Sequence, residues 1–86
     1  MFTVHWADRA LKELEALWFD ATRRTTERIV EAIKTLEARL MSNAEEFGES
    51  RFGQWRIGFQ APIAILFKVN REKRSVRIAH VMLYGK

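Results

Sequence analysis

Residues 53–83 read GQWRIGFQAPIAILFKVNREKRSVRIAHVML, and this stretch decides the fold. Apolar residues recur at every second position over residues 55–60, 63–69 and 76–83, which is the period of a half-buried β-strand. Pro62 separates the first strand from the second, and the polar segment 70–75, NREKRS, has the composition of a hairpin connection. Because both connections are short, the pattern predicts an antiparallel meander of three strands.

The two faces of this sheet are expected to differ. The residues predicted to lie under a covering layer are Trp55, Ile57, Phe59, Ile65, Phe67, Val69, Val76 and Ile78. The opposite face would then carry Arg56, Gly58, Ala64, Leu66, Arg77, Ala79, Val81 and Leu83. That face is apolar in its middle, and an exposed apolar strip on a small protein usually marks a partner site. The alternative is that a twist, a bulge or a self-dimer buries the last strand on both sides.

The first fifty residues supply the covering layer. Residues 1–6 alternate and predict a short strand, and Asp8 is a candidate N-cap for a helix with Leu11, Leu14, Leu17 and Trp18 on its inner face. Thr25 or Thr26 could cap a second helix, whose inner face would carry Ile29, Val30, Ile33, Leu36 and Leu40. The sequence therefore predicts one two-layer α+β domain over residues 1–86, with an N-terminal strand and an αα-hairpin packed on an antiparallel C-terminal sheet.

Composition narrows the class of protein. An apolar fraction of 48% with 30% charged residues is that of a globular chain. The absence of cysteine excludes disulfides, thiolate metal sites and a cysteine nucleophile, and it fits a reducing cytoplasm. No signal peptide is recognisable, and the longest apolar run, residues 61–67, is far shorter than the roughly 20 residues that span a membrane. No phosphate loop, metal-ligand spacing or other cofactor motif is found, so we expect no metal and no cofactor.

The net charge of +4 is unevenly distributed. Residues 1–50 hold seven Lys/Arg and ten Asp/Glu, a net of −3, whereas residues 51–86 hold eight Lys/Arg and one acid, a net of +7. A basic sheet half suggests nucleic acid or an acidic protein segment as a partner. A solvated surface that keeps a small protein in solution explains the same charges equally well.

Four segments stand out along the chain. DRALKEL (residues 8–14) opens the first predicted helix, and WRIGFQ (55–60), IAILFKV (63–69) and SVRIAHV (75–81) close the chain. These segments and the order of elements resemble the RelE/ParE superfamily of bacterial toxins. The resemblance covers nearly the whole sequence and is closest to small members known as plasmid stabilisation proteins. It implies a toxin held inactive by a cognate antitoxin, which would bind the apolar strip through Leu66, Arg77, Ala79, Val81 and Leu83.

The same resemblance implies two kinds of activity. Ribonuclease members cut messenger RNA on the ribosome, whereas ParE-type members poison DNA gyrase. For RNA cleavage without a metal, it points to Arg56 as phosphate clamp, His80 as acid or base and Tyr84 as a terminal contact. Further nucleic-acid contacts are expected from Arg51, Lys68, Arg71, Lys73, Arg74 and Lys86.

The sequence departs from the ribonuclease pattern at two positions. Gly58 stands where a basic residue is common, and Ala64 stands where an arginine would stabilise the phosphorane. Strict alternation also places His80 on the covered side as a structural residue, although one bulge would reverse that. We therefore predict the toxin of a type II toxin–antitoxin system. The alternatives are a ribosome-dependent endoribonuclease, or a gyrase inhibitor or attenuated relative that keeps only the antitoxin-binding surface.

Overall fold

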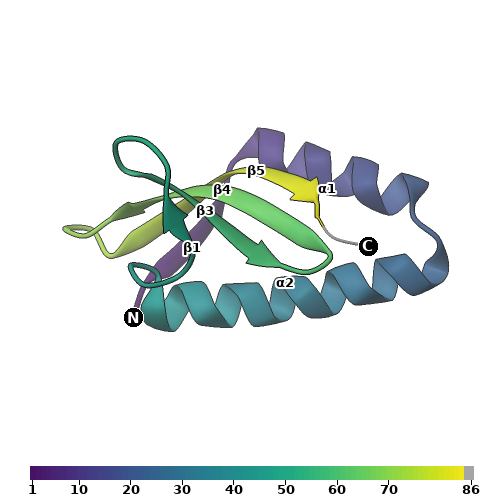
Figure 1. Ribbon diagram of the computed structural model, residues 1–86, viewed down its shortest axis with the longest axis horizontal. Helices are drawn as coiled ribbons and strands as arrows, with labels where there is room; N and C mark the ends of the chain where they lie inside the picture. Colours follow the sequence, from purple (N-terminus) through teal and green to yellow (C-terminus); the bar gives the residue numbers. More distant parts are fainter. Residues whose placement is uncertain (85–86) are drawn as a thin grey trace.

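The predicted α+β architecture is confirmed by the computed structural model, which describes residues 1–84 (Figure 1). Along the chain the elements are β1 (Thr3–Trp6), α1 (Asp8–Asp20), α2 (Arg23–Asn43), β2 (Glu49–Ser50), β3 (Trp55–Gln60), β4 (Ile63–Asn70) and β5 (Ser75–Leu83).

One five-stranded sheet has the strand order β1-β5-β4-β3-β2. Strands β3, β4 and β5 form the predicted antiparallel meander. The N-terminal strand β1 pairs in parallel with β5, so the sheet is mixed. β2 pairs antiparallel with β3 and was not predicted, because two polar residues are too few to show a periodicity.

The helix starts differ from the sequence prediction. Ala7 is the N-cap residue of α1 and has no capping side chain, so Asp8 is the first helical residue, where its carboxylate favourably meets the helix dipole. Thr22 caps α2, accepting a hydrogen bond from the backbone N–H of Thr25 at 3.2 Å. The second helix therefore begins three to four residues earlier than expected, and the turn between the helices is correspondingly shorter.

The core lies between the helices and one face of the sheet. Its largest fully buried side chains are Phe67, Ile29, Leu36, Leu40, Ile63, Ile65, Ile78 and Val76. On α1 the buried residues are Ala10 and Leu14, whereas the predicted inner residues Leu11 and Trp18 are about two-fifths exposed. The apolar stripe of α1 is thus rotated from the predicted one, because small Ala10 allows the helix to approach β5 closely.

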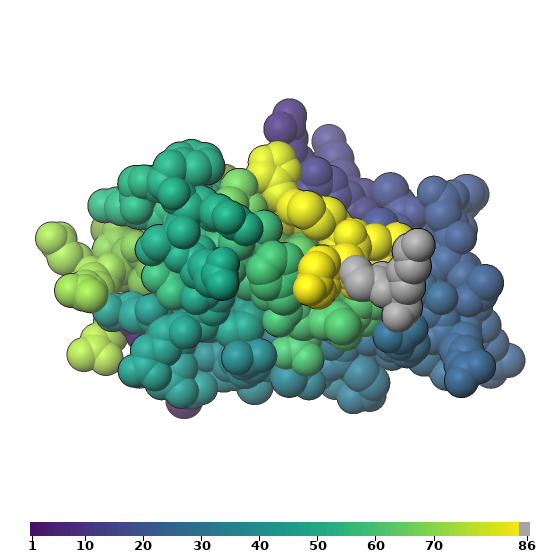
Figure 2. Space-filling view, in the orientation of Figure 1, coloured from purple at the N-terminus to yellow at the C-terminus, as the bar shows by residue number. Residues whose placement is uncertain are grey.

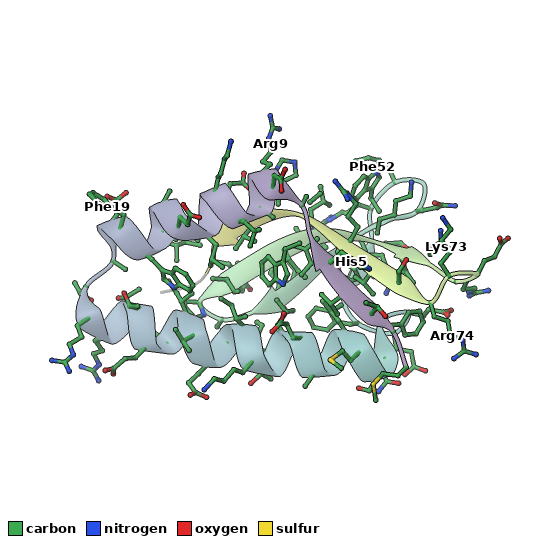
Figure 3. All side chains as sticks on the ribbon, turned by 180° about the vertical axis from the view of Figure 1, so that it is seen from behind. His5, Arg9, Phe19, Phe52, Lys73 and Arg74 are labelled. Atoms are coloured by element: carbon green, nitrogen blue, oxygen red, sulfur yellow. The ribbon has the colours of Figure 1, made fainter. Side chains whose placement is uncertain are left out.

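The helices leave one face of the sheet uncovered. Figure 1 shows α1 beside β5 and α2 along the opposite long side of the molecule. In the space-filling view from the same side, strands β3 to β5 reach the surface with neither helix in front of them (Figure 2). Seen from behind, the two helices occupy the other side, and β1 forms the edge of the sheet next to β5 (Figure 3). We call the uncovered side the open face and the other the helix face.

Candidate functional site

The strand register fixes which side chains share the open face. Residues directly opposite in an antiparallel ladder point to the same side of the sheet. Buried Phe67, Ile65 and Ile63 on β4 face the helices, and their partners on β3 are Arg56, Gly58 and Gln60. The open face therefore carries three rows across β3, β4 and β5, namely Trp55–Lys68–Arg77, Ile57–Leu66–His80 and Phe59–Ala64–Met82.

This register reverses the predicted faces of β3. The sequence prediction placed Trp55, Ile57 and Phe59 in the core, but they lie on the open face. Gly58 is buried instead, and a Cβ atom added there would meet the Phe47 ring, with 2.8 Å to Cζ. Phe47 comes from the loop before β2 and fills the helix face over β3, so that strand needs no large inward side chain. The alternation on β3 was identified correctly, but the prediction of which alternate residues face the helices was wrong.

A bulge in β5 brings His80 to the open face. Phe67 pairs with Ile78 and Leu66 pairs with His80, so Ala79 has no partner on β4. The bulge keeps Ile78 inward and turns His80 outward, which is the reversal that the sequence analysis left open. It also returns Val81 to the core, where only 4% of the residue is exposed.

Glu13 of α1 holds His80 in place from the edge of the sheet. Its Oε2 atom lies 3.2 Å from His80 Nδ1, and its Oε1 atom accepts a hydrogen bond from the Val81 N–H at 3.0 Å. Partial burial alone would raise the pKa of Glu13, but the Val81 N–H, His80 and the guanidinium of Arg9 together lower that pKa below its usual value. The carboxylate is therefore ionised at neutral pH. No sequence pattern indicated Glu13, because its partners are 67 and 68 residues away.

Two cations lie one row from His80. Lys68 and Arg77 are cross-strand partners, and Lys68 Nζ lies 5.7 Å from the centre of the Trp55 ring. The row is at the end of the sheet that carries the β4–β5 hairpin. A row of two cations and one aromatic ring beside a histidine can bind a phosphate and stack on a base.

Tyr84 covers the other end of the open face. Its ring packs on Phe59 with 4.4 Å between ring centres, and its backbone N–H donates to the carbonyl of Pro62. Phe59 is the cross-strand partner of Ala64, which is only 2% exposed even though it faces away from the helices. The aromatic pair therefore forms an apolar end to the open face, opposite the cationic end.

Arg56, the predicted phosphate clamp, lies on the helix face. Its Nε donates to the carbonyl of Phe47 at 3.0 Å, one Nη donates to the carbonyl of Gly48 at 2.9 Å, and the other approaches the Ser50 hydroxyl at 3.3 Å. All three nitrogens thus hold the segment that leads into β2. The structure does not bring Arg56 together with His80 and Tyr84, which lie on the opposite side of the sheet.

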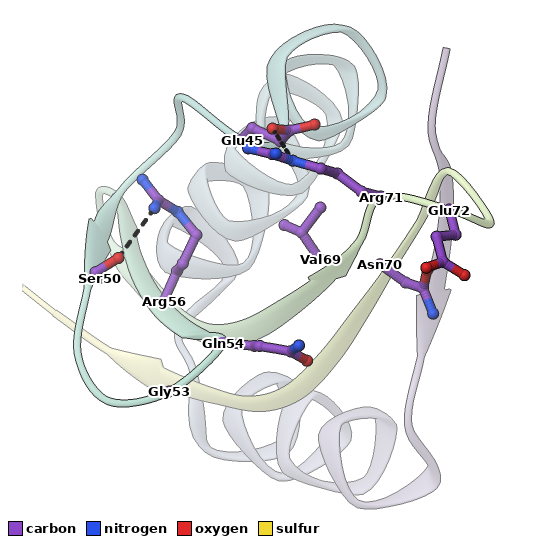
Figure 4. Close-up of a pocket in the computed structure, with 9 residues that line it drawn as sticks. All are labelled: Glu45, Ser50, Gly53, Gln54, Arg56, Val69, Asn70, Arg71 and Glu72. Atoms are coloured by element: carbon purple, nitrogen blue, oxygen red, sulfur yellow. Dashed lines mark hydrogen bonds and ion pairs between the residues drawn. The ribbon is translucent and has the colours of Figure 1, made fainter.

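A cavity of about 460 Å³ lies beside Arg56 (Figure 4). It is lined by Glu45, Ser50, Gly53, Gln54, Arg56, Val69, Asn70, Arg71 and Glu72. Arg71 Nε donates to Glu45 Oε2 at 2.7 Å, and Arg56 is bonded as described above. Since both arginines already have partners and two carboxylates share the cavity, its charges balance, and it is not a phosphate site.

The remaining predicted contacts are distributed around the hairpin end. Lys73 and Arg74 project from the β4–β5 turn, at the far end of the molecule from Phe19 (Figure 3). Arg51 is exposed in the loop before β3, and Lys86 lies outside the described residues. The expected antitoxin strip is divided: Leu66 and Arg77 are on the open face, Ala79 is at the bulge, Val81 is in the core and Leu83 is exposed at the strand end.

Residues 1–84 contain neither a metal-ligand cluster nor a membrane-spanning helix. Within them, no group of three or more His, Asp or Glu side chains is arranged to hold a metal ion. None of the helices described there is long and apolar enough to cross a membrane.

The fold matches those of solved toxins. Neither a protein-family model nor a curated protein sequence matches the chain. Among solved structures, the chromosomal ParDE toxin–antitoxin system of P. aeruginosa matches with a TM-score of 0.73 and 17% identity, over 99% of this chain and 98% of that one. The isolated E. coli RelE toxin matches with a TM-score of 0.66 and 20% identity, over 100% and 87%. An archaeal RelE–RelB complex from Pyrococcus horikoshii matches with a TM-score of 0.58 and 16% identity, over 99% and 97%.

Proposed function

We propose that this protein, which has the fold of the RelE/ParE toxins, is the toxin component of a type II toxin–antitoxin system and is neutralised by a cognate antitoxin. The observation that carries the proposal is the open face. Chains of this fold occur in solved complexes described as ParDE and RelE–RelB, and here the same sheet presents a face that no helix covers. As a single domain acting in the cytoplasm, the toxin would meet both its antitoxin and its target there.

The open face has the apolar and cationic side chains expected of an antitoxin-binding surface. Its apolar side chains are substantially exposed, with 36% for Phe59, 41% for Met82 and 47% for Tyr84. A contiguous apolar surface of this kind favours an amphipathic helix or an added strand as its partner. Lys68 and Arg77 border the apolar part, so the antitoxin segment should carry acidic residues at its matching end.

Binding measurements with the product of the adjacent reading frame test this proposal. We expect the two proteins to co-purify, and Met82→Asp to weaken the complex by roughly 30-fold or more, the effect of an interface hot spot of about 2 kcal/mol. Phe19→Asp is the matched control, because Phe19 is also an exposed apolar residue but lies at the tip of the helical hairpin, 90% exposed. Equal affinity of the wild type and Met82→Asp would place the antitoxin elsewhere.

Metal-independent RNA cleavage is the second candidate function, and the outward position of His80 favours it. His80 would take the proton of the 2′-hydroxyl, whose oxygen attacks phosphorus and expels the 5′-oxygen. That oxygen takes up a proton from water, leaving a 2′,3′-cyclic phosphate and a 5′-hydroxyl end. Lys68 and Arg77 would balance the charge of the phosphorane, and Tyr84 would contact the substrate. We assign the phosphate-clamp role to this cationic row in place of Arg56, which is occupied on the other face.

Primer extension on a reporter message during cell-free translation tests the second candidate. Cuts that require translating ribosomes and disappear in His80→Ala would support it. Lys34→Ala is the control, since Lys34 is an exposed cation on α2, a helix that contributes no side chain to the rows of the open face. An intact message would reject cleavage, and inhibition in a gyrase supercoiling assay would then identify DNA gyrase as the target.

A further inference from the structure

Both oxygens of Glu13 are committed to neighbouring residues of β5. Oε1 accepts from the Val81 N–H, and Oε2 lies against His80 Nδ1. β1 pairs with β5 only as far as Ile78, so the Val81 N–H faces the edge without a strand partner, and Glu13 supplies the acceptor. Because Val81 is buried, the first of these contacts fixes the plane and position of the carboxylate.

The helix that carries Glu13 cannot easily move the carboxylate away. Ala10 and Leu14, on either side of Glu13 in sequence, are 0% and 5% exposed and belong to the core. The His80 and Glu13 side chains are 34% and 36% exposed, so the pair lies at the surface of a rigid scaffold. A fixed carboxylate beside one ring nitrogen of a histidine determines which nitrogen carries the proton.

We propose that Glu13 is a positioning residue that holds neutral His80 as the Nδ1–H tautomer and so presents an unprotonated Nε2 to the open face. A carboxylate only accepts hydrogen bonds, so the ring nitrogen beside it must donate. Nε2 is then the acceptor available to a substrate hydroxyl, which makes His80 a general base. This inference rests on the proposed ribonuclease activity for its chemical consequence, but the tautomer itself does not depend on that activity.

The proposal explains why both carboxylate oxygens are engaged. If Glu13 served only to satisfy the Val81 N–H, one oxygen would suffice, and a glutamine would serve as well. Glutamine is the informative replacement, because its amide oxygen can keep the Val81 bond while its NH₂ group faces His80 Nδ1. An NH₂ group only donates, so Glu13→Gln should invert the histidine to the Nε2–H tautomer.

Nitrogen-15 NMR of the histidine ring at pH 8 tests the tautomer in the full-length protein. We expect the Nδ1 signal of wild-type His80 in the protonated range and Nε2 in the unprotonated range, with the two exchanged in Glu13→Gln. Glu15→Gln is the control, because Glu15 is an exposed acid on the same helix, and it should leave the spectrum unchanged. An Nε2–H tautomer in the wild type would overturn the proposal, and so would an unchanged Nδ1–H tautomer in Glu13→Gln.

Cleavage assays separate this inference from the proposed function. If His80 is the general base, Glu13→Gln should lower the cleavage rate by a factor on the order of 10² to 10⁴, the usual contribution of general-base catalysis. The double variant with His80→Ala should lose no more than His80→Ala alone, because Glu13 acts through the histidine. An exchanged tautomer in a protein whose wild type cuts no RNA would retain the positioning role and reject the ribonuclease function.

Discussion

Replacing Gly58 with alanine tests the reversed orientation of β3. The new Cβ would lie 2.8 Å from Phe47 Cζ and 2.9 Å from Cδ2, closer than real Cβ atoms approach a ring. Phe47 has little freedom to retreat, because it stacks on Phe67 with 5.8 Å between ring centres and lies under the Arg39 guanidinium at 4.3 Å. The added methyl group therefore overpacks the core.

The expected loss of stability follows from two opposing effects. Overpacking a close-packed core typically costs about 1–3 kcal/mol. Gly→Ala at an unstrained position gains about 0.4–1 kcal/mol, because the unfolded chain becomes less flexible. We expect a net loss of about 1–2 kcal/mol in the free energy of unfolding, and a Tm lower by about 5–15 °C for a chain of this size.

Chemical and thermal denaturation measure the effect, and a second substitution identifies its cause. If the Phe47 ring is the obstacle, Phe47→Leu should relieve part of the loss, and a double-mutant cycle should show a favourable coupling of about 1 kcal/mol. Had β3 the orientation predicted from the sequence, Gly58 would face solvent and alanine would be neutral or stabilising. A Gly58→Ala protein as stable as the wild type would therefore refute the register argument.

Three further predictions concern individual hydrogen bonds in the structure. Arg56→Ala should lower the free energy of unfolding by about 1.5–3 kcal/mol in urea denaturation, since it removes charged hydrogen bonds, while leaving any cleavage at the open face unaffected. Thr22→Ala should cost about 1 kcal/mol through the lost helix cap, measured by the same denaturation. Because the pKa of Glu13 is lowered on folding, its carboxylate adds stability that is present above about pH 4.3 and is lost as the pH falls through the folded value. Tm measured against pH should show this loss in the wild type and in Glu15→Gln but not in Glu13→Gln. Because the Glu13–His80 pair is partly exposed, the loss in free energy of unfolding should be below about 1 kcal/mol.

The sequence predicted the elements better than the orientation of their side chains. A period of two identifies a strand, but shifting a strand by one residue exchanges its faces, and only its neighbours decide which face is buried. On β4 the larger residues of the alternation, Ile63, Ile65 and Phe67, are indeed inward. On β3 the choice depended on Phe47, a loop residue whose position no local pattern indicates.

The candidate site was predictable only in part. His80 was identified as a residue of interest, but its placement depends on the bulge at Ala79, which leaves no clear mark in the alternation of SVRIAHV. Glu13 was not identified, since a helical period assigns a residue to a face of the helix but does not show which strand edge lies beside it. The hydrogen bond that determines its role joins the two ends of the chain.

The open face gives the proposed toxin one surface for two purposes. The row that contains His80 also contains Ile57 and Leu66, and it is bordered on one side by the cationic row and on the other by Phe59 and Met82. An antitoxin segment that buries the apolar side chains must therefore pass over His80, and acidic residues that pair with Lys68 and Arg77 would occupy the positions proposed for RNA phosphate. On the proposed function, neutralisation then requires no change of toxin conformation, because antitoxin and RNA would compete for the same rows of side chains. Tight binding of the antitoxin and loss of activity would accordingly be the same event.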